Sequence, residues 1–259
     1  MIKVDKTLVV GWEPALRGAR NPMNSWAKSD SGDICSCRQK LEDGDSHVPY
    51  CLDGFKPRSN EVFIGPNDYD LCKRLIKAGS DHRKFLRMIV VYADITAPLY
   101  WWKEYDTYKV GTVANSTSTM HKIHSKPITV YDFSMEDMFV PVLEEEVFVR
   151  DVFDRTISDC EMFRQKYLEY KEKAKDESLS EKERKAYADA SQRFWRRLIQ
   201  LLPSSYLQLR TVEMNYEVLY NMYHAREHHK LIEWHDFCDW VKSLPYSEFI
   251  TGHWDEVAR

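Results

Sequence analysis

One polar segment carries the densest set of side chains that could hold a ligand. Within residues 107–121 the chain places Lys109, Thr112, Asn115 and Ser118 close together in sequence. Hydroxyl and amide groups both donate and accept hydrogen bonds, and a lysine ammonium attracts phosphate. This combination favours a site for a planar or phosphorylated ligand. The alternative is an ordinary polar loop whose side chains form local turns.

Histidines mark two further candidates. His82 follows a helix stop and precedes an apolar strand, where it could contact a phosphate or the edge of a flavin, although a solvated turn is the simpler interpretation. His224 and His228 are four residues apart and could share one helix face as metal ligands. The macrodipole also stabilises histidines at the C-terminus of a helix without any metal, which is the interpretation we prefer.

The six cysteines divide into two groups of three. Three lie among apolar or helical neighbours and are expected to be reduced core thiols: Cys72, Cys160 and Cys238. Three more, with one histidine, form a weak alternative zinc set of the kind that binds tetrahedrally: Cys35, Cys37, His47 and Cys51. Because their spacing is not the usual C-x-x-C, we favour an irregular surface loop and expect no metal.

Composition limits the class of protein. The chain has 259 residues, 43% of them hydrophobic, and a net charge of −4. It can therefore bury a core, and it has no global positive field for general nucleic-acid binding. No stretch approaches the ~20 consecutive apolar residues of a membrane helix. We expect a soluble, cytoplasmic protein that binds no membrane.

Periodicity predicts the elements that position these side chains. Strands are expected at 7–11 and 88–95, and helices at 14–20, 67–77, 98–108, 212–227 and 230–243. A helical pattern also runs towards Tyr170, and the capping box Ser180–Glu183 opens a second long helix that ends near Leu202. The charged run 171–185 between them is typical of a solvated turn. The expected architecture is α+β, with a small sheet and a long helical hairpin.

The order of these motifs resembles the flavin-dependent thymidylate synthases, known as ThyX. Pro14–Arg20 resembles the first helix of that family, and residues 81–95 resemble its histidine turn and the following strand. The family signature R-H-R-x-x-S-x-N-x-x-S-x-R-Y is similar to residues 107–112 followed by 115–121, with one residue inserted. The likeness implies a single ThyX-like domain over 1–259. Two segments of this domain are not matched to the family, a variable loop insertion at about 28–60 and the helical hairpin at about 144–202.

The resemblance also implies a ligand set and partners. Matching positions that would bind a nucleotide or flavin are His82, Lys109, Thr112, Asn115, Ser118, His121, Asn215, Arg226 and His235. No catalytic residue is assigned. FAD is the implied cofactor, a pyrimidine nucleotide is the implied ligand, and the implied assembly is a homo-oligomer, either a dimer or a tetramer. The chain is similar to divergent relatives encoded by phages and prophages, which would place it in a bacterial host cell.

The departures from the family concern arginines. The signature Arg-His-Arg is Thr107-Tyr108-Lys109 here, and three further arginine positions hold other residues: Thr119 or Met120, Tyr216 or Glu217, and His235. Each lost charge-assisted contact costs ~1.5–3 kcal/mol, so we expect a nucleotide- or flavin-type pocket that does not make thymidylate. If chemistry survives, it would be flavin-dependent methyl or hydroxymethyl transfer to a pyrimidine nucleotide. The alternative is a catalytically inactive relative that acts as a phage-encoded binding or interaction protein, with Glu217 paired to Lys109 or Arg226.

Overall fold

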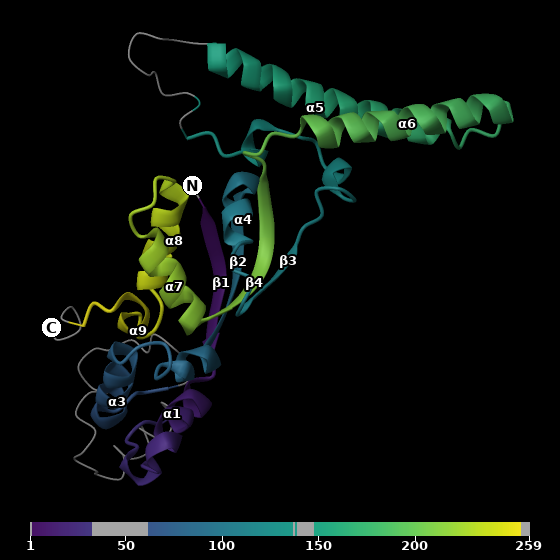
Figure 1. Cartoon of the computed structure of the whole chain (residues 1–259). Coiled ribbons are helices and arrows are strands. Elements are labelled where there is room, and N and C mark those ends of the chain that lie inside the picture. Colours follow the sequence, from purple (N-terminus) through teal and green to yellow (C-terminus); the bar gives the residue numbers. More distant parts are fainter. Residues whose placement is uncertain (1, 33–61, 137, 139–147, 255–259) are drawn as a thin grey trace, which may run out of the picture. The chain divides into compact units, whose positions relative to one another are not determined.

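The computed structural model describes residues 2–32, 62–136, 138 and 148–254 of the chain. Their strands form one antiparallel sheet in the order β1-β2-β4-β3. The strands are β1 (Lys3–Val10), β2 (Val90–Pro98), β3 (Thr112–Ser116) and β4 (Leu207–Asn215). The helices are α1 (Trp12–Arg20), α3 (Pro66–Lys77), α4 (Leu99–Tyr105), α5 (Phe148–Lys173), α6 (Glu181–Leu201), α7 (Tyr216–Arg226), α8 (Ile232–Lys242) and α9 (Glu248–Thr251). This mixed content confirms the predicted α+β class (Figure 1).

The chain divides into two compact units. The hairpin unit comprises Thr96–Asp106 and Ser116–Arg210, and the terminal unit comprises Ile2–Ile95, Thr107–Asn115 and Thr211–Arg259. No helix among the described residues has both the length and the apolar content needed to cross a membrane.

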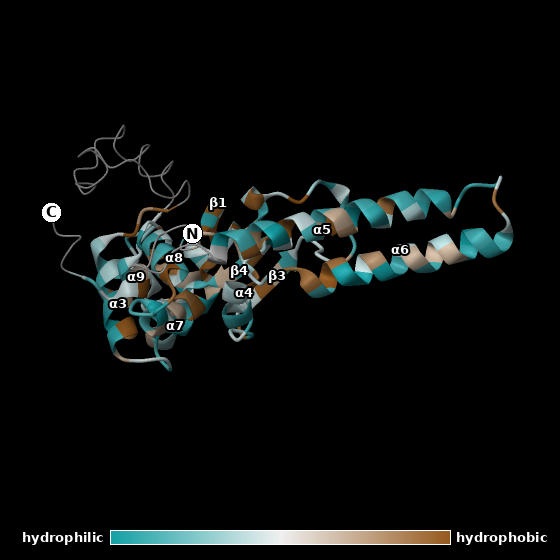
Figure 2. Cartoon of the chain, turned by 90° about the horizontal axis from the view of Figure 1, so that it is seen from above, coloured by the Kyte–Doolittle hydropathy of each residue, from teal (hydrophilic) through white to brown (hydrophobic). Residues whose placement is uncertain are grey.

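The hairpin unit is dominated by α5 and α6, which pack along each other (Figure 1). The Ser180 hydroxyl and the Glu183 side chain form the predicted capping box at the start of α6. Hydrophilic residues cover much of the hairpin (Figure 2). Its apolar residues join a core that consists of Ile123, Ile128, Phe133, Phe153, Ile157, Cys160 and Leu198. The predicted helical hairpin is confirmed.

The terminal unit packs α7 against α8, α9 and the short 3-10 helix η3 (Lys84–Met88). Trp12 of α1 is fully buried and meets the ring of Tyr216 edge-on, with 5.2 Å between the centroids. The Trp240 Nε1 group of α8 donates to the Thr7 hydroxyl of β1 at 3.0 Å. Buried aromatic side chains of this kind contribute strongly to the stability of a protein core.

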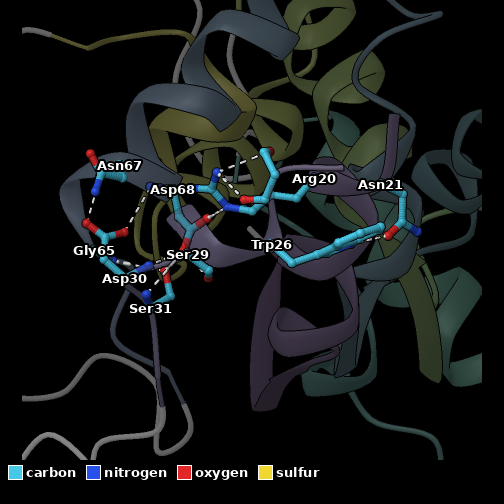
Figure 3. Close-up of polar contacts among 10 residues, drawn as sticks. Arg20, Asn21, Trp26, Ser29, Asp30, Ser31, Gly65, Asn67 and Asp68 are labelled. Atoms are coloured by element: carbon cyan, nitrogen blue, oxygen red, sulfur yellow. Dashed lines mark hydrogen bonds and ion pairs between the residues drawn. The ribbon is translucent and has the colours of Figure 1, made fainter. Parts of the chain in front are cut away.

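A buried ion pair joins α1 to α3 in the terminal unit (Figure 3). Arg20 Nε donates to Asp68 Oδ1 at 2.5 Å, and these side chains are only 4% and 1% exposed. The other Asp68 oxygen accepts from the hydroxyls of Ser29 and Ser31 and from the backbone N–H groups of Asp30 and Ser31. Burial disfavours the charged carboxylate, but these hydrogen bonds and the charge of Arg20 outweigh it and lower the pKa of Asp68.

Several elements differ from the sequence prediction, among them three near the candidate site and the buried ion pair. The helix expected from Val212 begins at Tyr216, because the preceding residues belong to β4. The polar stretch after Gly111 contains strand β3. Helix α3, expected over 67–77, begins at Pro66, and the Asp30 carboxylate accepts the backbone N–H groups of Asn67 and Asp68 from outside the helix.

Candidate functional site

The first half of the candidate ligand segment forms a fixed turn in the terminal unit. The Thr112 hydroxyl donates to the Tyr108 carbonyl oxygen across this turn. Gly111 has a φ of 79°, and a Cβ atom at this position would lie 2.6 Å from Nδ2 of Asn215. Only glycine satisfies both the backbone conformation and the close approach. The turn that presents Lys109 is therefore rigidly placed against the start of α7.

Asn215, one of the predicted ligand residues, is the N-cap of α7. Its Oδ1 atom accepts the backbone N–H of Val218 at 2.9 Å, which satisfies one of the unpaired donors at the helix start. Its Nδ2 atom faces Gly111. The side chain thus connects the ligand segment to α7, and ligand binding by Asn215 stays a prediction.

Arg226, at the end of α7, contacts the signature segment through Tyr108. Its Nε atom donates to the Tyr108 hydroxyl at 2.9 Å. The guanidinium carbon lies 4.7 Å from the ring centroid of Trp234, which is fully buried, and 5.5 Å from that of Tyr108. Cation–π contacts of this kind hold an arginine in a defined orientation. Sequence reasoning missed the two aromatic partners, which lie far from Arg226 or on another helix.

Glu217 forms an ion pair with Arg83, and not with Lys109 or Arg226 as the alternative of an inactive relative proposed. The Arg83 Nε atom lies 3.0 Å from Glu217 Oε2, and the side chains are 11% and 10% exposed. The guanidinium also lies 3.8 Å from the ring centroid of Tyr220. Because the charges are matched and largely shielded from water, Glu217 presents no free negative charge here. The sequence contained one signal for this pair, a cation in the turn before the strongest predicted strand.

Four of the predicted residues in the terminal unit are exposed, and three of them have no side-chain partner among the described residues. His82, Lys109 and Asn115 make no side-chain hydrogen bond or ion pair with any residue that the structure describes. His235 is exposed as well, but its Nε2 atom lies 2.7 Å from the carbonyl oxygen of His229. The exposed groups combine a cation, an amide and an imidazole, which together could contact a phosphorylated or planar ligand.

The second half of the segment lies in the hairpin unit. The Ser118 hydroxyl accepts the backbone N–H of His121 at 2.8 Å, which closes a local turn of the kind expected as the alternative. Thr117 donates through its hydroxyl to the Leu209 carbonyl at 3.2 Å, and Gln208 Nε2 donates to the Thr117 carbonyl at 2.8 Å. The imidazole of His121 is exposed.

The alternative metal sites gain no support. His224 Nε2 lies 3.1 Å from the Ile250 carbonyl oxygen, and burial lowers the pKa of its imidazole. Across residues 2–32, 62–136, 138 and 148–254, no group of three His, Cys, Asp or Glu side chains is placed to hold a metal ion. The alternative zinc set, namely Cys35, Cys37, His47 and Cys51, lies outside the described residues.

The three predicted core thiols are confirmed as free and buried: Cys72, Cys160 and Cys238. The aromatic residues of α4 are buried as well, since Trp101, Trp102 and Tyr105 are at most 1% exposed.

Comparison with known proteins gives a structural likeness. No family model matches the chain, and no curated protein matches its sequence. The chain is similar to the crystal structure of thymidylate synthase X (ThyX) from Helicobacter pylori with FAD and dUMP, with a TM-score of 0.58 and 14% identity over 100% of both chains. A second structure, flavin-dependent thymidylate synthase ThyX from Helicobacter pylori complexed with FAD and dUMP, gives a TM-score of 0.53 and 15% identity over 96% of this chain and 98% of the other. The likeness confirms that this chain has a ThyX-like fold.

Proposed function

We propose that the protein binds a flavin or a pyrimidine nucleotide at the signature segment and does not synthesise thymidylate. The observation that carries this proposal is the ThyX-like fold, which extends over the whole chain. The two similar structures contain FAD and dUMP. The exposed side chains of His82, Lys109 and Asn115 supply donors for such a ligand in the terminal unit.

The donor set fits the anionic part of FAD or of a nucleotide. Lys109 carries a positive charge that has no ion-pair partner among the described residues, and it projects from a turn that is already rigid. A preformed turn lowers the entropy that binding must overcome. When bound, a flavin would supply redox chemistry at its ring system. The chain's own residues would bind and orient the ligand.

The arginine positions argue against thymidylate synthesis. In the family that the sequence resembles, these arginines hold the nucleotide phosphate, and here one position carries the Glu217 side chain paired with Arg83. Losing three charge-assisted contacts at ~1.5–3 kcal/mol each weakens binding by several powers of ten, since ~1.4 kcal/mol is one factor of ten. A substrate that needs all of these contacts is therefore a poor ligand.

The same ion pair favours a second function. A shielded Arg83–Glu217 pair neutralises both charges without a ligand. This is expected of an inactive relative that acts as an interaction protein in a phage-infected bacterial cytoplasm.

Under either function we propose a homo-oligomer. Light scattering at micromolar concentration should return at least twice the mass of 30.7 kDa. A single-chain mass would contradict this part of the proposal.

Two measurements test the proposed function. The purified protein should show the visible absorption of oxidised flavin, or bind FAD or dUMP in calorimetric titrations, and Lys109→Ala should abolish that binding. Lys28→Ala is the matched control, because Lys28 is exposed and lies outside the segments that resemble the family. A colourless protein that binds neither compound supports the interaction protein instead.

Genetic complementation tests the proposal that the protein does not synthesise thymidylate. We expect no growth of a thymidine-requiring strain that expresses this chain in medium without thymidine. Robust growth would show that other residues replace the missing arginines.

A further inference from the structure

His124 in the hairpin unit has an unusual hydrogen-bonding state. Its Nδ1 atom is buried without a hydrogen-bond partner, and its other ring nitrogen, Nε2, is not among the buried unpaired atoms and makes no hydrogen bond with the described residues. A buried N–H without an acceptor is costly, so the neutral ring is best accommodated with its proton on Nε2. The accessible nitrogen of His124 is then a hydrogen-bond donor without an acceptor.

Cations from α5 gather around this imidazole. The His124 ring meets Tyr167 edge-on, with 4.9 Å between the centroids. Lys171, one turn further along α5, donates through Nζ to the Tyr167 hydroxyl at 3.2 Å. Arg164 donates through Nη1 to the His124 carbonyl oxygen at 3.2 Å. Tyr167 is therefore the common neighbour that brings the Lys171 ammonium close to the ring.

The charges in this cluster are not balanced. Burial lowers the pKa of His124, and the charges of Lys171, Lys122 and Arg164 lower it further. Arg164 is neutralised by Glu161, whose two oxygens lie 2.7 Å from the guanidinium nitrogens. Neither Lys122 nor Lys171 has an ion pair within the part of the chain that the structure describes. The side chains of Lys122 and Lys171 are exposed, and both of their charges act on the His124 imidazole.

We propose that Lys122, His124 and Lys171 form a binding site for a phosphate group, either free phosphate or the phosphate of a monoester. Lysine ammonium groups bind phosphate as point charges, and a neutral imidazole adds a directed donor. Tyr167 fixes the imidazole and one ammonium relative to each other before the ligand arrives. The site is argued from the hairpin unit alone and does not depend on the flavin or nucleotide proposal.

NMR of the histidine side chains tests the site in the full-length protein at neutral pH. Inorganic phosphate is titrated at constant ionic strength, and the imidazole signals of His124 are assigned by their loss in His124→Gln. We expect a saturable shift of these signals. We also expect Lys171→Gln to weaken the apparent affinity about tenfold or more, the loss of one charge-assisted contact. Lys175→Gln is the matched control, since Lys175 pairs with Glu172 at 2.7 Å, and it should leave the affinity unchanged.

Each alternative has its own outcome. An equal shift with sodium chloride, or no saturation with phosphate, would overturn the site, as would equal affinities for Lys171→Gln and Lys175→Gln. A second titration with dUMP identifies the source of the phosphate, because tighter binding at His124 than that of inorganic phosphate indicates a monoester. The Lys109→Ala variant should respond to phosphate at His124 as the wild type does, which separates this site from the proposed function.

Discussion

The Asp68→Asn substitution gives the sharpest test of what holds the terminal unit together. It keeps the shape of the side chain but removes the charge that faces Arg20, whose side chain is 4% exposed. Two hydroxyl groups and two backbone N–H groups also point at this carboxylate (Figure 3). All four of these groups donate to Oδ2, which an amide oxygen could replace, but the amide NH2 group would then face Arg20 Nε as a second donor, so the hydrogen bond from Arg20 would be lost.

The contacts of Arg20 and Asp68 determine how much stability each substitution should remove and which should remove more. Removing one partner of a buried ion pair costs about 3–5 kcal/mol, and we expect a loss in this range for Asp68→Asn. Arg20→Met should cost less, about 1.5–3 kcal/mol, because Oδ1 loses its Arg20 donor while the four donors to Oδ2 still stabilise the carboxylate. It also removes the Arg20 Nη2 atom, which is buried without a hydrogen-bond partner.

Hydrogen exchange of the α3 amides measures these losses within the terminal unit. Asp70→Asn on the same helix is the matched control, since its pair with Arg74 is about two-thirds exposed and should contribute at most about 1 kcal/mol. A loss for Asp68→Asn no larger than that of Asp70→Asn, or smaller than that of Arg20→Met, would refute the reasoning.

The pH dependence follows from the lowered pKa of Asp68. Its ionisation stabilises the fold above the pKa of an unfolded aspartate, about 3.9, and this contribution is lost as the pH falls through the lower folded value. The stability difference between the wild type and Asp68→Asn should therefore be constant near neutral pH and shrink below about pH 4.

Three further predictions concern local structure. Gly111→Ala should destabilise the terminal unit by about 1–3 kcal/mol in thermal or urea unfolding, because a positive φ and a 2.6 Å approach to Asn215 both exclude a side chain; unchanged stability would contradict this. Ser180→Ala should cost about 1 kcal/mol and speed amide exchange in the first turn of α6, whereas Ser178→Ala should leave that turn unchanged. Cys72 is buried and burial raises the pKa of its thiol, so it should react with a thiol reagent at neutral pH only after unfolding.

The sequence predicted those elements whose signals are local. The capping box at Ser180 and the charged run before it located the helical hairpin, and the apolar run from Met88 located β2. Strand β4 was missed because its buried positions include the polar residue Gln208. The Gln208 amide is satisfied by the carbonyl oxygen of Thr117, 91 residues away, so no local pattern could reveal that this position is buried.

The candidate site shows the same limit. The sequence suggested a meeting of Glu217 with Lys109 or Arg226, but the partners of Glu217 and Arg226 lie far along the chain. Arg83 is 134 residues from Glu217, and Tyr108 is 118 residues from Arg226. With equal charges available at several positions, single-sequence reasoning could not decide which of them would meet.

The observed pairing of Arg83 with Glu217 bears on which residue would carry the proposed function. An unpaired Glu217 would repel a phosphate, and a free Arg83 would attract one, but at 3.0 Å from each other they form a pair with no net charge. Arg226 is oriented by Tyr108 and Trp234. Under the proposed function, an anionic ligand in the terminal unit would depend on Lys109, and one substitution at that position would then distinguish a ligand-binding protein from an interaction protein.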